Sequence, residues 1–186
     1  MKRIASVVLT AALVLSMGVA AFAATPSKTV LDEVTASATV ETSGLDITDV
    51  DTTETEETKA QSEEALKDLA ASNAELKKLT EATAEENVEV VAVQTVTVVR
   101  TPLFNRSTVT VEMSSSIISA AYAENEEVTV VVTYPVTVNG KTTYQKMAVK
   151  GVVKNGKVQV TLTGAQLKKI GRNKVTLVAT KKVAKV

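Results

Sequence analysis

The fold is decided by residues 127–163, which read EVTVVVTYPVTVNGKTTYQKMAVKGVVKNGKVQVTLT. Three runs rich in Val and Thr are separated by two Asn-Gly dipeptides, Asn139-Gly140 and Asn155-Gly156. Asn-Gly between apolar runs is the preferred sequence of a two-residue type I′ hairpin turn. These residues therefore predict an antiparallel meander of three strands.

The two turns fix the register of this meander independently of each other. The first turn places Gly151 opposite Val128. The second places Gly151 opposite Val160 and Val149 opposite Leu162. Both turns assign Gly151 to the same face of the shared strand, and a one-residue slip in either turn would break that agreement. The inner face of the meander is predicted to consist of Val128, Val130, Val132, Met147, Val149, Val158, Val160 and Leu162.

The sequence on either side of the meander predicts further strands and a short helix. Runs rich in Val and Thr at 88–100, 107–113 and 173–180 are typical of strands. Between the meander and the last run, Thr163 with Gln166 three residues later is a capping box, which marks the start of a helix. A glycine follows at position 171, where it suits the end of that helix.

Residues 57–86 predict one amphipathic α-helix. Ala, Leu, Glu, Lys and Gln dominate residues 57–83, which contain neither Gly nor Pro. A stripe of leucines runs along one face of this helix: Leu66, Leu69, Leu76 and Leu79. Two interpretations remain open, a helix docked on the domain that follows and a short coiled coil between two chains. We expect docking, because two heptads are short for a coiled coil.

Residues 24–56 predict a disordered acidic linker. They are rich in Thr, Ser, Asp and Glu and contain few large apolar side chains, so they bury too little surface to offset the entropy of ordering. The carboxylates of Asp46, Asp49, Asp51 and Glu54 lack the glycine and the register of a calcium-binding EF-hand loop. We expect a solvated linker here.

The strand pattern of residues 88–184 resembles the immunoglobulin-like sandwiches that are common in secreted bacterial proteins. The cysteine pair, the core tryptophan and the tyrosine corner of antibody domains are absent from it. The resemblance implies a mainly β protein with a single Ig-like antiparallel β-sandwich at residues 87–186. A fold shared by so many proteins carries no function with it.

Residues 1–23 predict a cleavable secretory signal peptide. Lys2 and Arg3 precede an uncharged apolar run, and Ala21 and Ala23 give small residues at the positions that a signal peptidase reads. We expect cleavage after Ala23. No second apolar run is long enough to span a bilayer, so no membrane span is expected after cleavage.

Composition excludes the commonest catalytic chemistries. The chain contains no His, Cys or Trp. The commonest ligands of zinc, copper and haem are therefore missing, as are mechanisms based on histidine or cysteine. We expect no metal, no cofactor and no enzyme activity. An enzyme that uses only Glu, Lys, Ser or Tyr is the alternative, for which the strand region offers five carboxylates: Glu89, Glu112, Glu124, Glu126 and Glu127.

Charge divides the chain into an acidic and a basic half. Residues 24–87 hold 16 acidic and 5 basic side chains, whereas residues 88–186 hold 5 acidic and 14 basic ones. Basic residues near the C-terminus are candidates for binding a polyanion: Lys168, Lys169, Arg172, Lys174, Lys181 and Lys182. No aromatic residues alternate with them for base stacking, so nucleic acid is not expected.

These observations together predict a non-enzymatic, secreted bacterial protein. We expect it to act outside the cell, in association with the cell wall, as a binding or assembly module. Its expected partner is an anionic cell-wall polymer or another surface protein. Self-association between the acidic and basic halves is the alternative.

Overall fold

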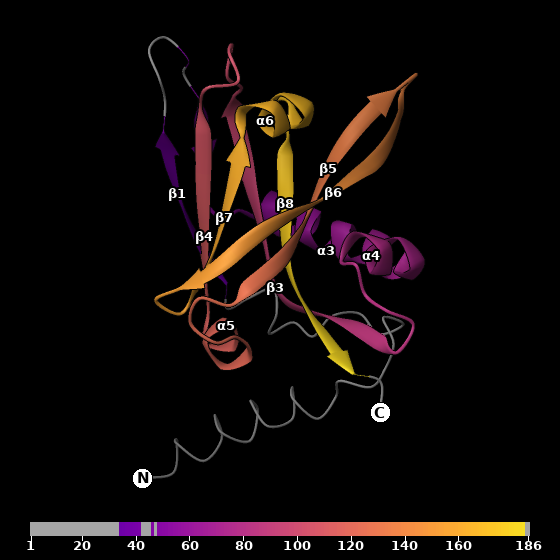
Figure 1. Cartoon of the computed structure of the whole chain (residues 1–186). Helices are drawn as coiled ribbons and strands as arrows, with labels where there is room; N and C mark the ends of the chain where they lie inside the picture. The colour runs from indigo at the N-terminus through magenta and orange to yellow at the C-terminus, as the bar shows by residue number, and fades with distance from the viewer. Residues whose placement is uncertain (1–33, 42–45, 47, 185–186) are drawn as a thin grey trace.

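The computed structural model describes residues 34–41, 46 and 48–184, and the strands within them form one antiparallel sheet (Figure 1). The strand order across this sheet is β1-β4-β7-β6-β5-β8-β3-β2. The strands are β1 (Thr35–Glu41), β2 (Asp49–Asp51), β3 (Glu86–Arg100), β4 (Thr108–Ser114), β5 (Glu127–Val138), β6 (Lys141–Lys154), β7 (Lys157–Thr163) and β8 (Lys174–Ala184). The helices are α3 (Glu56–Ala71), α4 (Asn73–Leu79), α5 (Ser116–Ala121) and α6 (Gly164–Ile170).

The predicted meander is confirmed as β5, β6 and β7. Gly151 lies opposite Val128 in one strand pair and opposite Val160 in the other. All four turn residues have positive φ, between 52° and 75°, as a type I′ turn requires. The predicted pairing of Val149 with Leu162 is not formed, because β7 stops pairing with β6 beyond Gly151 and continues beside β4.

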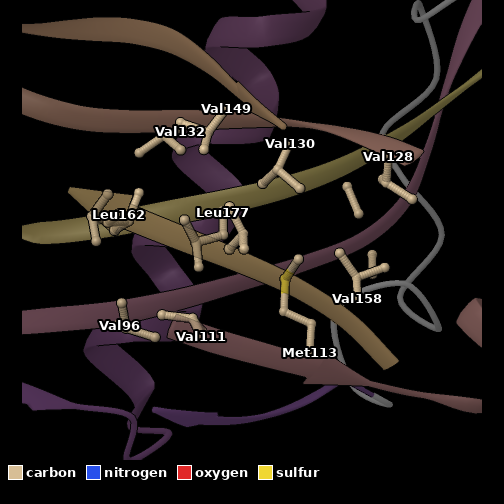
Figure 2. Close-up of a cluster of buried hydrophobic side chains, with 14 of the residues drawn as sticks. Val96, Val111, Met113, Val128, Val130, Val132, Val149, Val158, Leu162 and Leu177 are labelled. Carbon is tan, nitrogen blue, oxygen red and sulfur yellow. The ribbon is translucent and has the colours of Figure 1, made fainter. Parts of the chain in front are cut away.

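The sheet curves so strongly that it is nearly barrel-shaped. β1 and β2, the two outermost strands of the order, come into contact with each other. The inner face is lined by buried valines, with the larger side chains of Met113, Leu162 and Leu177 among them (Figure 2). Two short helices add to this core from opposite ends of the barrel, α5 with Ile118 and α6 with Leu167 and Ile170.

The Ig-like sandwich is not confirmed. A sandwich divides its strands between two sheets packed face to face. Here β8 pairs with β3 on one side and with β5 on the other, so the late strand joins the earlier strands and the meander in one sheet. The coarser prediction of a mainly β, antiparallel fold is correct.

The prediction of a disordered linker at residues 24–56 is wrong for the two segments that form β1 and β2. The inward side chains of β1 are small, and its outward side chains are Thr, Ser and Glu, so the segment resembles a linker in composition. β1 pairs over its whole length with β4, and β2 pairs with the end of β3. The sheet therefore begins well before residue 87.

The prediction of one helix at residues 57–86 is not confirmed, because the segment forms two helices, α3 and α4, with a break at Ser72, and β3 begins at Glu86. Both helices dock on the outer face of the sheet. A second core lies beneath the two helices, separate from the barrel interior: Leu66, Leu69, Leu76, Val88, Val93, Val131 and Val178. Of the two open interpretations of the leucine stripe, the structure shows docking. Among the residues that the structure describes, no helix is long and apolar enough to cross a membrane.

Polar contacts fasten the helices to the sheet as well. The Lys146 amine, on β6, lies 2.8 Å from a carboxylate oxygen of Asp68 on α3 and 2.8 Å from one of Glu75 on α4. Burial opposes the charge on Lys146, but the two carboxylates outweigh that effect and raise its pKa. Nearby, the Thr95 hydroxyl hydrogen-bonds with Ser62 at 2.6 Å and with Thr176 at 2.8 Å.

Candidate binding surface

The loop that connects β3 to β4 is built around one buried carboxylate. Asp46 has no exposed surface. One of its carboxylate oxygens accepts a hydrogen bond from the backbone N–H of Phe104 at 2.8 Å, and the other accepts from Arg106 and Ser107, both at 3.0 Å. The Ser107 hydroxyl donates to the Asp46 carbonyl at 2.7 Å. Four hydrogen bonds from a distant segment therefore fix the course of this loop.

The charge on Asp46 is maintained by the same contacts. Burial alone would raise the pKa of this carboxyl, because it penalises the charged form. The backbone hydrogen bonds from Phe104, Arg106 and Ser107 outweigh burial and lower the pKa below its ordinary value. Asp46 thus holds the loop as a carboxylate at neutral pH.

Helix α6 supports the loop from the other side. Gly164, its first residue, lies so close to Asn105 that a Cβ atom there would come within 2.7 Å of the Asn105 Cα. Only glycine allows this approach without displacing backbone. The Lys168 amine, one turn further along α6, donates a hydrogen bond to the Leu103 carbonyl at 2.6 Å.

The loop presents two adjacent large apolar side chains to solvent. Leu103 is 69% exposed and Phe104 is 57% exposed. The only other large apolar side chains that are exposed in the described part of the chain are Val99, near the end of β3, and Val138, at the tip of the β5–β6 hairpin. We refer to Leu103 and Phe104 as the apolar apex.

Exposed basic side chains lie at the same end of the barrel as the apolar apex. They come from the end of β3, from the loop itself and from α6 with the turn that follows it: Arg100, Arg106, Lys168, Lys169 and Arg172. Exposed acidic side chains at this end are Glu41, at the end of β1, and Asp49 and Asp51 on β2. Glu57 is exposed as well, but it is ion-paired with Lys174 at the start of β8. This end of the barrel is therefore cationic at its surface.

The six candidate polyanion-binding residues do not form one patch. Lys168, Lys169 and Arg172 lie on α6 and just after it, beside the apolar apex. Lys174, at the start of β8, is ion-paired with Glu57 on α3.

The remaining two candidates, Lys181 and Lys182, lie near the opposite end of β8. The Lys181 amine donates to the Ala121 carbonyl and lies 5.3 Å from the centre of the Tyr122 ring. Hydrogen bonds from Thr83 lower the pKa of the Glu86 carboxyl, and the charge of Lys182 adds a smaller effect in the same direction. Lys181 and Lys182 are close in sequence to Lys168, Lys169 and Arg172. In the structure, however, strand β8 runs from one end of the barrel to the other and separates the two groups.

Most of the carboxylates considered for catalysis are engaged in local contacts. Glu112 lies 3.0 Å from the Lys157 amine and accepts a hydrogen bond from Gln159 at 2.6 Å, on the outer face of the sheet. Three more bond to backbone N–H groups of turns or to a neighbouring lysine: Glu124 to Asn155, Glu126 to Ala123 and Glu127 to Lys150. Glu89 lies on β3, opposite Lys181 of β8 in the strand register. No group of metal-ligating side chains suitable for an ion occurs among the described residues.

Tyrosine side chains offer no open aromatic platform. Tyr134 is buried in the barrel core, and Tyr122 is buried at its α5 end. Tyr144 is half-buried and accepts a hydrogen bond from Gln61 on α3 at 3.1 Å. Phe104 is thus the most exposed aromatic side chain in the described part of the chain.

Comparisons with known proteins give no relative from which a function can be carried over. The chain matches no protein-family model, no curated protein and no solved structure. The candidate surface is therefore argued from its own geometry.

Sequence reasoning did not identify the apolar apex. The available signal was the segment Thr101-Pro102-Leu103-Phe104-Asn105, in which two large apolar residues stand between turn-forming residues. The prediction of a solvated linker is wrong for Asp46, because nothing in its local sequence indicates the loop that it binds, about sixty residues further along the chain.

Proposed function

We propose that this is a non-enzymatic, secreted bacterial protein that binds a component of the cell surface through its apolar apex and the basic side chains around it. The observation that carries this proposal is the fixed exposure of Leu103 and Phe104. Two adjacent large apolar side chains in water are unfavourable for a free monomer, and burying each of them fully is worth about 1.5–3 kcal/mol. Adjacent exposed apolar side chains of this kind mark interaction sites.

The rigidity of the loop supports this proposal. A buried carboxylate is costly unless its hydrogen bonds are satisfied, and the backbone of this loop donates three to the Asp46 carboxylate. A short polar turn would connect the same two strands without a buried charge. The arrangement holds Leu103 and Phe104 outward in one conformation, which lowers the entropy lost on binding.

Self-association through the acidic and basic halves has less support. Opposite-charge contacts between the halves are made within one chain, by Lys146 with Asp68 and by Lys174 with Glu57. These contacts use side chains that the alternative would need at an interface between molecules. The leucine stripe of α3 and α4 is likewise buried within the same chain.

The proposal is tested by binding to cell envelopes. The protein recovered after export from its expression host is mixed with purified bacterial envelopes that contain both wall and membrane, and the bound fraction is measured after sedimentation. Its intact mass is expected to correspond to residues 24–186. We expect the double variant Leu103→Ser/Phe104→Ser to bind at least about tenfold more weakly, because both apolar contacts are lost.

A matched control is Val138→Ser, which also removes an exposed apolar side chain, 59% exposed, from the tip of the β5–β6 hairpin. This control variant is expected to bind like the unmodified protein. Thermal unfolding of all three proteins checks that they are folded. Equal binding by the double variant and the unmodified protein would overturn the proposal, as would equal losses in the double variant and the control.

A further inference from the structure

We infer that the ligand of the apolar apex is an anionic lipid bilayer, into whose interface Leu103 and Phe104 insert. This inference rests on the proposed function and names the class of partner. It is carried by three features of the same end of the barrel: the projection of the two side chains, the position of the neighbouring cations and the fixed backbone of the loop.

The apolar side chains project outward on a loop, and no concave surface is needed to receive them. Leu103 and Phe104 are followed by Asn105 and Arg106, both exposed, before the chain re-enters the sheet. A bilayer accepts such a projection anywhere on its surface. Side chains such as these, carried on a polar support, insert to the boundary between headgroups and acyl chains.

The nearest cation lies at the level that a headgroup would occupy. The Lys168 amine is 2.6 Å from the carbonyl oxygen of Leu103, so it sits at the backbone from which the apolar side chain projects. When that side chain enters the acyl region, the amine is left among the headgroups. Lysine and arginine side chains favour this position, with the charge at the interface.

The surface charge matches an anionic membrane. Five exposed cations lie at this end of the barrel with the exposed acids Glu41, Asp49 and Asp51, while Glu57 is ion-paired with Lys174, so cations outnumber acids here. Each cation near an anionic membrane surface contributes about 1 kcal/mol, and the contribution is screened by salt. Cations and apolar side chains therefore act together, and neither alone gives stable anchoring.

A hydrophilic wall polymer or a protein partner fits these features less well. A wall polyanion would bind the cations and leave Leu103 and Phe104 in water. A protein partner would need a pocket for the projection and about 800 Å² of its own surface in a standard interface. Both partners are kept as outcomes of the test.

The absence of tryptophan from this chain allows a direct experiment. The variant Phe104→Trp carries a single indole at the apex, and its emission reports the polarity around it. The exported protein is titrated with vesicles of equal parts phosphatidylcholine and phosphatidylglycerol. We expect a shift of emission to shorter wavelength and a loss of quenching by acrylamide. Vesicles of phosphatidylcholine alone are expected to bind at least about tenfold more weakly.

Two variants serve as matched controls. Val138→Trp places the single indole at the hairpin tip, where no shift is expected. Lys169→Glu with Arg172→Glu, combined with Phe104→Trp, reverses two exposed charges beside the apex and leaves Lys168 in place. This combination is expected to weaken binding to the anionic vesicles by at least about tenfold.

The outcomes distinguish the inference from the proposed function. An emission shift for Phe104→Trp but not for Val138→Trp supports insertion at the apex. Equal shifts for both show non-specific adsorption and overturn the inference. If the apex tryptophan does not respond to vesicles while envelope binding still depends on Leu103 and Phe104, the inference fails and the proposed function stands, with a polymer or a protein as the ligand. If envelope binding also fails to depend on them, both are wrong.

Discussion

The variant Leu66→Ala tests whether helices α3 and α4 are an integral part of the folded unit. The Leu66 side chain is completely buried between α3 and the outer face of the sheet, beside Val93 and Val178. Replacing a buried leucine by alanine costs about 2–5 kcal/mol, with the larger values where the cavity cannot relax. This core contains few side chains and lies beneath a single layer of helix, so partial collapse is expected. We therefore expect a loss of about 2–3 kcal/mol.

The measurement is equilibrium unfolding in urea, followed by circular dichroism at two protein concentrations. Leu79→Ala is the matched control, because Leu79 lies on the same stripe but is only partly buried, and it is expected to lose about 1 kcal/mol or less. A loss below about 0.5 kcal/mol for Leu66→Ala would refute the docking argument. An unfolding midpoint that rises with protein concentration would instead indicate that the stripe pairs between chains.

Three further predictions concern single contacts. Lys146→Met leaves Asp68 and Glu75 without their cation, and because both carboxylates are partly exposed we expect a loss of about 1–2 kcal/mol in urea unfolding; an unchanged midpoint would contradict it. Gly164→Ala brings a Cβ atom against the Asn105 backbone and should destabilise the fold by about 1–3 kcal/mol, where an open helix position would gain stability from the same change. Burial, with a smaller effect from Glu126, raises the pKa of Tyr122, so the neutral phenol stabilises the fold fully below about pH 10 and this contribution is lost as the pH rises further. Tyr122→Phe should keep its stability at pH 7, because the buried hydroxyl has no hydrogen-bond partner among the described residues, and should lose less of it above about pH 10 than the unmodified protein; equal losses in the two proteins would refute this.

The strands of the C-terminal half are predictable because their information is local. Each Asn-Gly dipeptide sets both a turn type and a register, and the two registers had to agree at Gly151. The capping box at Thr163 and Gln166 is confirmed for the same reason, since its partners are three residues apart. Signals of this kind depend only on residues a few positions apart, so they can be recognised without knowing the rest of the fold.

The closure of the sheet was not predictable, because it depends on partners far apart in sequence. β1 offers small inward residues such as Ala36 and Ala38, which add to a core only once β4 lies beside them. β8 pairs with β3 on one edge and with β5 on the other, and this double pairing makes one sheet instead of two. No local sequence pattern determines which strands β8 pairs with. The apolar apex was missed for a related reason: a pair of apolar residues in a loop becomes informative only when Asp46 shows that the loop is held in place.

The two outermost strands of the sheet are neighbours in the sequence, which affects how the edges of the sheet are protected. β1 and β2 are consecutive in the chain, yet they occupy opposite ends of the strand order. Strand edges without a neighbour invite pairing with other molecules, and a long unprotected edge is an aggregation hazard. Two consecutive strands thus cover the edges of both β4 and β3, and loss of β1 by proteolysis would uncover the edge of β4. β1 finds its partner only once β4 has been synthesised, so it stays unpaired, and open to proteolysis or to pairing with another chain, while the intervening helices and β3 form.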